Sequence, residues 1–174
     1  MDVVVPAEFQ HLYVRDDSRP VYKIPDPVLR TKAEPITKVS KRHKVLADNM
    51  VRIMKQANGV GLAGPQIGVS ERIIVIAPDK KPIVLLNPEI TKATGSQVGE
   101  EGCLSIPGLY GDVERFEEVE VEAFDIKGRP IGYQLRGYGA VIVQHEIDHL
   151  DGVLFIDKVN PATLHWQDPN PKGE

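Results

Sequence analysis

The stretch Gln144-His145-Glu146-Ile147-Asp148-His149-Leu150-Asp151-Gly152 decides how this chain is organised. An α-helix advances 3.6 residues per turn, so His145 and His149 lie one turn apart on the same face of a helix. Two imidazoles arranged in this way can bind one metal ion, and Glu146 on the same helix can reach a water molecule beside that ion. The stretch therefore predicts a metal site with a general base next to it.

The residues around this motif predict a buried helix from Tyr138 to Leu150. Its apolar residues fall on several faces rather than on one stripe, which is typical of a helix enclosed by the rest of the protein. Asp151-Gly152 supplies the glycine expected just past a helix end. Two histidines and a glutamate are costly to bury without partners, which indicates a ligand site. The alternatives are a surface helix with chance histidines and core histidines bonded to backbone carbonyls. We favour the ligand site.

Length and composition limit the class of protein. The chain has 174 residues and a net charge of −4, with acidic and basic residues interspersed. We expect one catalytic domain over residues 1–174, with loosely structured ends at 1–20 and 161–174. No strongly cationic nucleic-acid surface is expected, and no apolar run approaches the ~20 residues that span a bilayer. The single cysteine excludes an internal disulfide framework and indicates a reducing compartment.

Hydrophobic periodicity predicts a second helix and several strands. Apolar residues at spacings of three and four follow Ser40, which indicates an amphipathic helix over about 40–57. Asn87-Pro88 is expected to end one strand, and Ile90 to begin another. The predicted fold class is α+β, with antiparallel strands packed around a buried central helix that carries the HExxH motif. Short apolar or alternating runs predict strands at residues 73–76, 83–86, 119–124, 131–135 and 153–156.

The stretch Gly59–Gly68 contains four glycines and a proline, which rule out a regular helix or a central strand. It has no G-x-G-x-x-G fit and no Lys-Ser/Thr pair, so phosphate binding is rejected. The remaining interpretations are a plain connecting loop and a loop whose backbone comes close to a ligand, with Gln66 as an amide donor.

A catalytic metal site of this kind keeps three protein ligands and one open position. The extended pattern H-E-x-x-H-x-x-G-x-x-H is matched as far as Gly152, but Phe155 stands at its last position. A downstream glutamate is disfavoured because Glu174 is the only one. The other histidines lie near the chain ends or on a polar helix face. Cys103 is the best remaining candidate, and the alternative is an inert buried cysteine.

Three stretches taken together resemble peptide deformylase. The motifs of that family read G-x-G-L-A-A-P-Q, E-G-C-L-S and Q-H-E-x-D-H-L-x-G. Here they stand in the same order at Gly59–Gln66, Glu101–Ser105 and Gln144–Gly152. The similarity extends over about residues 21–160. The chain departs from the pattern at Gly64, where the family usually has alanine, and we expect this to change loop stiffness more than chemistry.

The resemblance implies removal of the N-formyl group from the terminal methionine of newly made polypeptides, with release of formate. It implies that Cys103, His145 and His149 hold one divalent ion, which lowers the pKa of a bound water. Glu146 would accept a proton from that water and pass it to the departing amine. The predicted function is therefore a metal-dependent hydrolase.

The other two motifs supply the groups expected around the substrate. The Gln66 side-chain amide and the Leu104 backbone N–H would stabilise the negative charge that develops on the formyl oxygen. Gly61 would let its loop approach closely. The backbone around Val60 and Gly102 could pair with the main chain of the substrate as an added strand, which reads little sequence beyond the first residue.

The predicted helix also offers a wall for the methionine side chain. Tyr138 and Val141 precede His145 by about two turns and one turn, and Ile142 is adjacent. These residues line either a pocket or plain core, since pockets are themselves mostly apolar. The family pattern further suggests that Glu101 pairs with Arg115 and so fixes the cysteine loop.

The identity of the ion, the partners and the location follow less directly. Thiolate and imidazole ligands suit zinc, whereas the resemblance implies ferrous iron (Fe2+) natively, with nickel or cobalt as active substitutes. The implied partners are N-formylmethionyl nascent peptides, with no nucleic acid and no membrane. The long C-terminal helix of some members is missing, which leaves docking to the ribosome in doubt. Formyl initiation implies a bacterial cytoplasm or an organelle interior.

Two other functions stay open on the sequence alone. The chain could be a metallopeptidase that cuts ordinary peptide bonds, or a metal-binding protein without enzyme activity. A formamide carries only hydrogen on its carbonyl carbon, so a tight site can exclude larger acyl groups. Comparing formyl, acetyl and internal peptide substrates therefore distinguishes a deformylase from a metallopeptidase. Replacing Glu146 with Gln distinguishes an enzyme from a metal-binding protein, because a binding protein does not need the general base and would keep its function.

Overall fold

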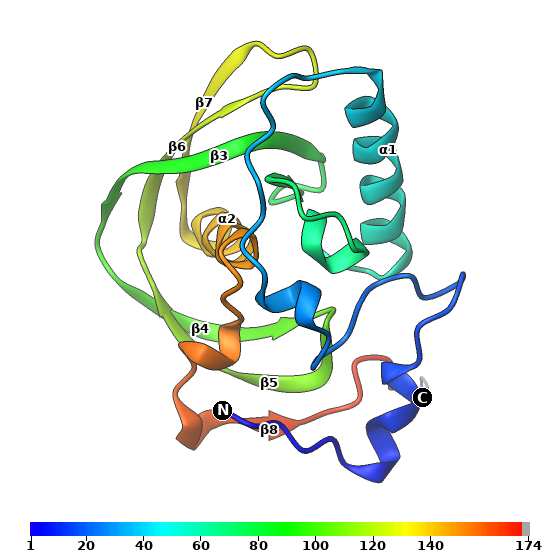
Figure 1. Ribbon diagram of the computed structural model, residues 1–174. Coiled ribbons are helices and arrows are strands. Elements are labelled where there is room, and N and C mark those ends of the chain that lie inside the picture. Colours follow the sequence, from blue (N-terminus) through cyan, green and yellow to red (C-terminus); the bar gives the residue numbers. More distant parts are fainter. Residues whose placement is uncertain (172–174) are drawn as a thin grey trace.

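The computed structural model describes residues 1–171 as an α+β fold with antiparallel sheets, which confirms the predicted class (Figure 1). The two α-helices of this part are α1 (Lys41–Gln56) and α2 (Gly137–Leu150). One sheet has the strand order β1-β2-β3-β6-β7 and the other β4-β5-β8. The strands are β1 Gly61–Ala63, β2 Ile73–Ile76, β3 Ile83–Thr94, β4 Gln97–Cys103, β5 Ile106–Arg115, β6 Glu118–Phe124, β7 Pro130–Arg136 and β8 His165–Trp166.

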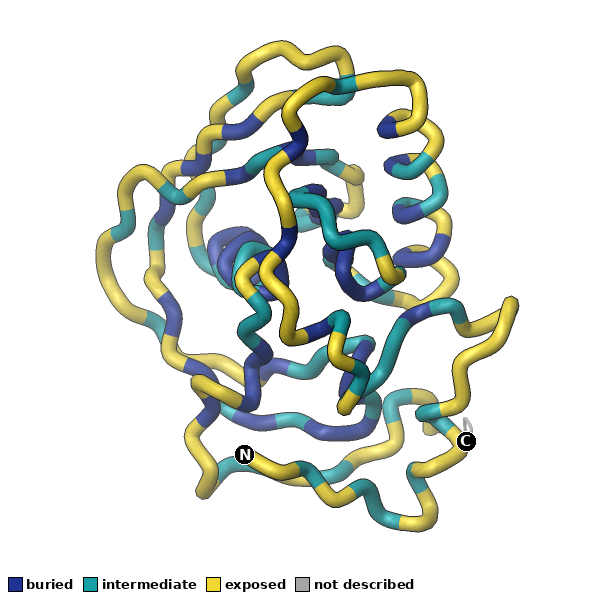
Figure 2. The backbone as a smooth tube through the Cα atoms, viewed as in Figure 1, coloured by how far each residue is buried: buried dark blue, intermediate teal, exposed yellow. Residues whose placement is uncertain are grey.

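Helix α2 lies in the middle of the molecule. Strands β3, β6 and β7 run along one side of it and β4 and β5 along another, while α1 stands apart on the opposite side (Figure 1). Most of the α2 backbone is buried, whereas α1 shows one exposed face (Figure 2). Most apolar residues on the several faces of α2 are therefore in contact with protein, as expected for an enclosed helix, whereas Tyr138 in its first turn is 61% exposed.

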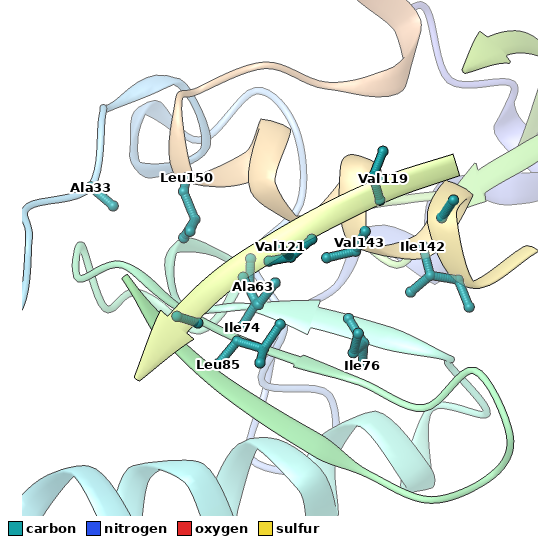
Figure 3. Packing of buried hydrophobic residues seen from close by; sticks show 12 residues of the cluster. Ala33, Ala63, Ile74, Ile76, Leu85, Val119, Val121, Ile142, Val143 and Leu150 are labelled. Atoms are coloured by element: carbon teal, nitrogen blue, oxygen red, sulfur yellow. The ribbon is translucent and has the colours of Figure 1, made fainter. Parts of the chain in front are cut away.

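Strand β2 is buried on both faces and links two parts of the core. All four of its side chains have no exposed surface. Ile74 and Ile76 pack with Val143 of α2 (Figure 3), whereas Ile73 and Val75 pack with the cluster around α1. Alternate residues of a strand point to opposite faces, so a continuous apolar run is needed here. Burying each side chain of this size contributes about 1.5–3 kcal/mol.

Strand β3 is longer than the sequence indicated. The prediction that Asn87-Pro88 ends the strand and that Ile90 begins another is wrong, because β3 continues from Ile83 to Thr94. The pairing with β6 shifts register between Leu86 and Glu89, so the proline sits in a bulge. Asn87 has φ of 50°, and its side chain accepts from the Ile36 N–H and donates to the Ile36 carbonyl, both at 2.8 Å.

The predicted strand at residues 153–156 is also wrong, since a 3-10 helix, η4 (Phe155–Asp157), stands there. Leu154, Phe155 and Ile156 are all buried in one cluster, so no alternation of faces is present. The Asp157 carboxylate accepts a hydrogen bond from the Leu154 N–H at 2.9 Å and pairs with Arg30, which holds the turn closed.

Strands β1, β4 and β5 were not predicted because they contain glycine, which lowers strand propensity. Packing against neighbouring residues explains why glycine stands at two of these positions. A Cβ on Gly102 would lie 2.6 Å from the Tyr110 ring, and a Cβ on Gly111 would lie 2.6 Å from Val159. Close approach of the two strands and of the following chain therefore excludes a side chain at these positions.

Both chain ends carry structure that the sequence did not indicate. Residues Ala7–Tyr13 form a 3-10 helix, η1, whose Phe9 ring lies 5.3 Å from the Trp166 ring. Strand β8 pairs with β5, Trp166 opposite Leu109. The two ends therefore meet at the lower edge of the molecule in Figure 1. Further 3-10 helices are η2 Pro27–Arg30, η3 Gly64–Ile67 and η5 Pro161–Thr163.

Within residues 1–171, no helix combines the length and apolar character that crossing a membrane requires.

Candidate active site

The centre of the candidate site is a group of three side chains from α2 and the end of β4. The donor atoms of Cys103, His145 and His149 all lie within 4.8 Å of one another, and Cys103 Sγ is 3.3 Å from His149 Nε2. Burial lowers the pKa of His149 well below its usual value, and the nearby His145 lowers it further. His149 is therefore neutral and offers a lone pair. One sulfur and two nitrogens form a donor set that suits a transition-metal ion, so this group could hold one.

The cysteine reaches α2 because β4 and β5 turn sharply beside it. Cys103 is the last residue of β4 and stands opposite Ile106 of β5, after a shift of register from Glu101. At the other side, Gly152 has φ of 72°, and a Cβ there would lie 2.6 Å from the Arg30 carbonyl oxygen. Only glycine lets the chain leave α2 against this backbone.

A buried ion-pair network orients His145. Arg115 donates to both oxygens of Glu101, each at 2.9 Å, which confirms the predicted pair. Glu101 Oε1 lies 2.8 Å from His145 Nδ1, so the other ring nitrogen faces the donor group. Arg115 also donates to Asp148 at 2.6 Å. Burial opposes ionisation of Glu101, but hydrogen bonds from Arg115 and His145 outweigh it and lower its pKa to about 2.

Glu146 lies beside the donor group with one oxygen free of any bond. It is 4% exposed, and its Oε2 has no hydrogen-bond partner in residues 1–171. Burial raises its pKa to about 7, although the neighbouring His145 acts in the opposite direction. A Cβ on Gly61 would lie 2.8 Å from Glu146 Cγ, so the glycine loop passes directly against this carboxyl group. A carboxyl group with this pKa can exchange a proton near neutral pH.

Gln66 points its amide at the same centre. Its Oε1 accepts a hydrogen bond from the Ala63 N–H at 3.0 Å. This bond fixes the side chain with Nε2 directed toward Cys103 and Ser105. Nε2 donates to Ser105 Oγ at 3.1 Å and approaches Cys103 Sγ at 3.6 Å. Gln66 is 1% exposed. The amide donor is thus held in place before any ligand enters.

A cleft of about 580 Å³ opens onto this centre. Cys103, His145 and Glu146 line the cleft, whereas the buried His149 does not. The predicted substrate residues line its walls, together with Gln66 and Leu104. They are Val60, Gly61, Gly102, Tyr138, Val141 and Ile142.

Other residues of the cleft were not found from the sequence. Leu12, Arg19 and Lys23 near the beginning of the chain and Pro169 and Asn170 near its end also line it. These segments carry no motif, and only their folding against β5 brings them to the cleft. Asp148 was likewise missed as a partner of Arg115, although it lies inside the helix motif.

Gly64, where the sequence departs from the family pattern, has a packing role. A Cβ there would lie 2.7 Å from the Val69 carbonyl oxygen and 2.8 Å from that of Glu71. The absence of a side chain therefore lets residues 69–71 pack tightly against the turn that carries Gln66.

Comparisons with known proteins agree with one another. A family model described as Polypeptide deformylase matches residues 18–165. Peptide deformylase of Dictyoglomus thermophilum is 45% identical over 150 residues, covering 86% of this chain and 98% of that protein. Peptide deformylase of Halothermothrix orenii is 50% identical over 141 residues, covering 80% and 92%. The crystal structure of peptide deformylase from Thermotoga maritima has a TM-score of 0.79 at 39% identity and covers 81% of this chain and 97% of that one.

Proposed function

This chain belongs to the polypeptide deformylase family and removes the N-formyl group from nascent polypeptides, and we propose that it does so at the centre formed by Cys103, His145 and His149. The observation that carries this assignment is the convergence of these three donor atoms within 4.8 Å beside Glu146 Oε2, which has no hydrogen-bond partner among residues 1–171. In this proposal the antiparallel strands serve as a scaffold around α2, the central helix that carries the HExxH motif.

The three donors would hold one divalent ion. Such an ion supplies Lewis acidity, which polarises the formyl oxygen and acidifies a water molecule. Ferrous iron is the proposed native ion, with zinc, nickel or cobalt able to take its place. Cys103 is then sensitive to oxidation, which fits a reducing bacterial cytoplasm or organelle interior.

Glu146 acts as the general base and then as the general acid. Its free Oε2 accepts a proton from the attacking water, and the same oxygen returns this proton to the amine that leaves. The raised pKa of Glu146, about 7, suits both transfers because the group gains and loses a proton near neutral pH. Gly61 leaves the space that this carboxyl group occupies.

Gln66 and Leu104 stabilise the negative charge that develops on the formyl oxygen. The Gln66 Nε2 donor is already oriented by the Ala63 N–H, so no reorganisation is needed during the reaction. The Leu104 backbone N–H follows the cysteine directly and is proposed as the second donor. Together they act only when the charge appears, which favours the transition state over the bound substrate.

The substrate lies along the cleft as an added strand. The backbone at Val60 and Gly102 would pair with its main chain, and the wall formed by Tyr138, Val141 and Ile142 would receive the methionine side chain. A formamide carries only hydrogen on its carbonyl carbon, so in this proposal the centre accepts that hydrogen and rejects a larger acyl group. This excludes internal peptide bonds and so disfavours a general peptidase.

The test uses protein purified without oxygen, with formate release from formyl-Met-Ala as the readout. We expect Glu146→Gln to reduce kcat by about 10²- to 10⁴-fold while the metal content stays at one ion per chain. Glu122→Gln, an exposed change on β6, is the matched control and should leave kcat unchanged. Acetyl-Met-Ala should not be cleaved. Full activity of Glu146→Gln, or equal cleavage of the acetyl peptide, would contradict the proposal.

A further inference from the structure

The family match begins at residue 18 and ends at residue 165, yet residues outside it form part of the cleft. Leu12 comes from the segment before the match, and Pro169 and Asn170 come from the segment after it. We call residues 7–19 and 165–170 the terminal wall. The terminal wall lies beside β5 and away from α2 (Figure 1). It therefore forms an additional boundary of the cleft and is not part of the catalytic centre.

The terminal wall is built by specific contacts. The Phe9 and Trp166 rings pack at 5.3 Å, and the Tyr13 hydroxyl donates to the Pro107 carbonyl at 3.0 Å. Gly108 has φ of 90°, and a Cβ there would lie 2.8 Å from the Phe9 ring and 3.4 Å from the Trp166 ring. A glycine in β5 therefore leaves the space into which both ends fit. The wall is a packed feature and not a pair of loose tails.

The beginning of the chain also brings two cations to the cleft. Arg19 and Lys23 both line it. Arg19 donates to the His11 carbonyl at 3.1 Å, and Lys23 donates to the Val21 carbonyl at 2.8 Å. Neither forms an ion pair with a carboxylate among residues 1–171, so their charges are available to a ligand. Arg15 lies close by, over the ring of Tyr22 at 3.9 Å.

The acidic groups of the cleft are already engaged or lie at the catalytic centre. Glu101 is bonded by Arg115 and His145, and Glu146 faces the metal ligands. Glu100, on β4, lies 3.1 Å from His165 Nε2 of the terminal wall. This part of the cleft therefore presents two cations, Arg19 and Lys23, and one carboxylate, Glu100, whose charge His165 offsets when it is protonated. Arg19 and Lys23 attract a negatively charged side chain that enters beside them and repel a positively charged one.

We propose that the terminal wall adds a subsite for residues of the nascent peptide beyond the second, and that Arg19 and Lys23 make this subsite favour acidic side chains. The inference rests on the proposed function, because it assumes that the substrate runs along this cleft. The cations line the cleft that holds the catalytic centre rather than a flat outer surface, which favours a peptide side chain over the phosphates of an RNA.

The test measures kcat/KM on formyl-Met-Ala-Xaa-Ala peptides that carry Glu, Gln or Lys at Xaa. Each value is divided by kcat/KM on formyl-Met-Ala. The same series is run with Xaa moved to the fourth position. We expect Glu to exceed Lys by about 3- to 10-fold at one of these positions, mainly through KM. The preference should weaken as salt is raised, because the cations are partly exposed.

Arg19→Glu should give the Lys peptide a higher kcat/KM than the Glu peptide. Arg19→Gln should make the two kcat/KM values nearly equal. Arg19 is exposed, so these variants keep the fold. Lys127→Glu, in the exposed turn between β6 and β7, makes the same charge change outside the cleft and should preserve the wild-type order.

Equal values for all peptides, with formyl-Met-Ala still cleaved, would overturn the subsite and leave the deformylase assignment intact. No cleavage of formyl-Met-Ala would instead overturn the proposed function itself. If an RNA oligonucleotide bound in competition while the peptides showed no charge preference, the cations would have a different occupant and the proposal would be wrong.

Discussion

The catalytic centre and the terminal wall border the same cleft but hold their side chains in different ways. At the centre, Arg115, Glu101 and His145 are joined by bonds of 2.8–2.9 Å; Arg115 and Glu101 are buried, and the His145 side chain is 11% exposed. In the terminal wall, Arg19 is exposed and its side chain donates to the His11 carbonyl at 3.1 Å. The centre therefore fixes the geometry of the chemistry, whereas the wall can change its charge at little cost. In our proposal, a buried part of the molecule carries the reaction and an exposed part carries the preference for substrate.

The largest effect on stability is expected when the buried network is broken. Arg115→Met leaves the Glu101 and Asp148 carboxylates without their shared partner. We expect a loss of about 3–5 kcal/mol in the free energy of unfolding, together with a lower metal content, since His145 loses its orientation. Chemical denaturation and metal analysis measure the two effects.

Arg136→Met is the matched control, because it removes the exposed pair between Arg136 and Glu118. A loss of at most about 1 kcal/mol is expected there. If the two variants were equally stable, the network would not hold the centre together.

A smaller effect is expected when space beside the general base is filled. Gly61→Ala places a methyl group 2.8 Å from Glu146 Cγ, so the carboxyl group must move. We expect kcat on formyl-Met-Ala to fall by about 10- to 100-fold with little change in metal content. Gly99→Ala on β4 is the control, because no atom lies within 4 Å of a Cβ at that position. A wild-type kcat for Gly61→Ala would show that the position of Glu146 is not critical.

The smallest effect is expected when the terminal wall is loosened. Phe9→Ala removes the ring that packs on Trp166 and should raise KM on formyl-Met-Ala-Glu-Ala by about two- to fivefold. The ratio to the value on formyl-Met-Ala isolates the contribution of the wall. Val4→Ala, at a position that is 84% exposed, serves as the control. If KM rose equally for the long and the short peptide, the wall would not contact residues beyond the second.

The helix motif shows which features of the site a local sequence pattern can predict. His145, Glu146 and His149 share a helix, so their spacing places them together whatever the rest of the fold does. The strands at 119–124 and 131–135, which correspond to β6 and β7, were also predicted, because alternation is a local signal. In contrast, β4 and β5 escaped prediction because their glycines are explained only by the neighbours they approach, Tyr110 and Val159.

By itself the sequence determined the helix, its two imidazoles and its carboxylate, since these depend on the helical repeat and on residue type. Elimination of the other candidate ligands pointed to the cysteine, the glycine-rich loop offered the amide as one of two interpretations, and the family motifs favoured both. Only the tertiary structure decided that Cys103 turns toward His149, that Asp148 joins Arg115, and that the two chain ends meet at the cleft. These contacts join residues far apart in the chain, and packing in three dimensions, which no local pattern encodes, brings them together.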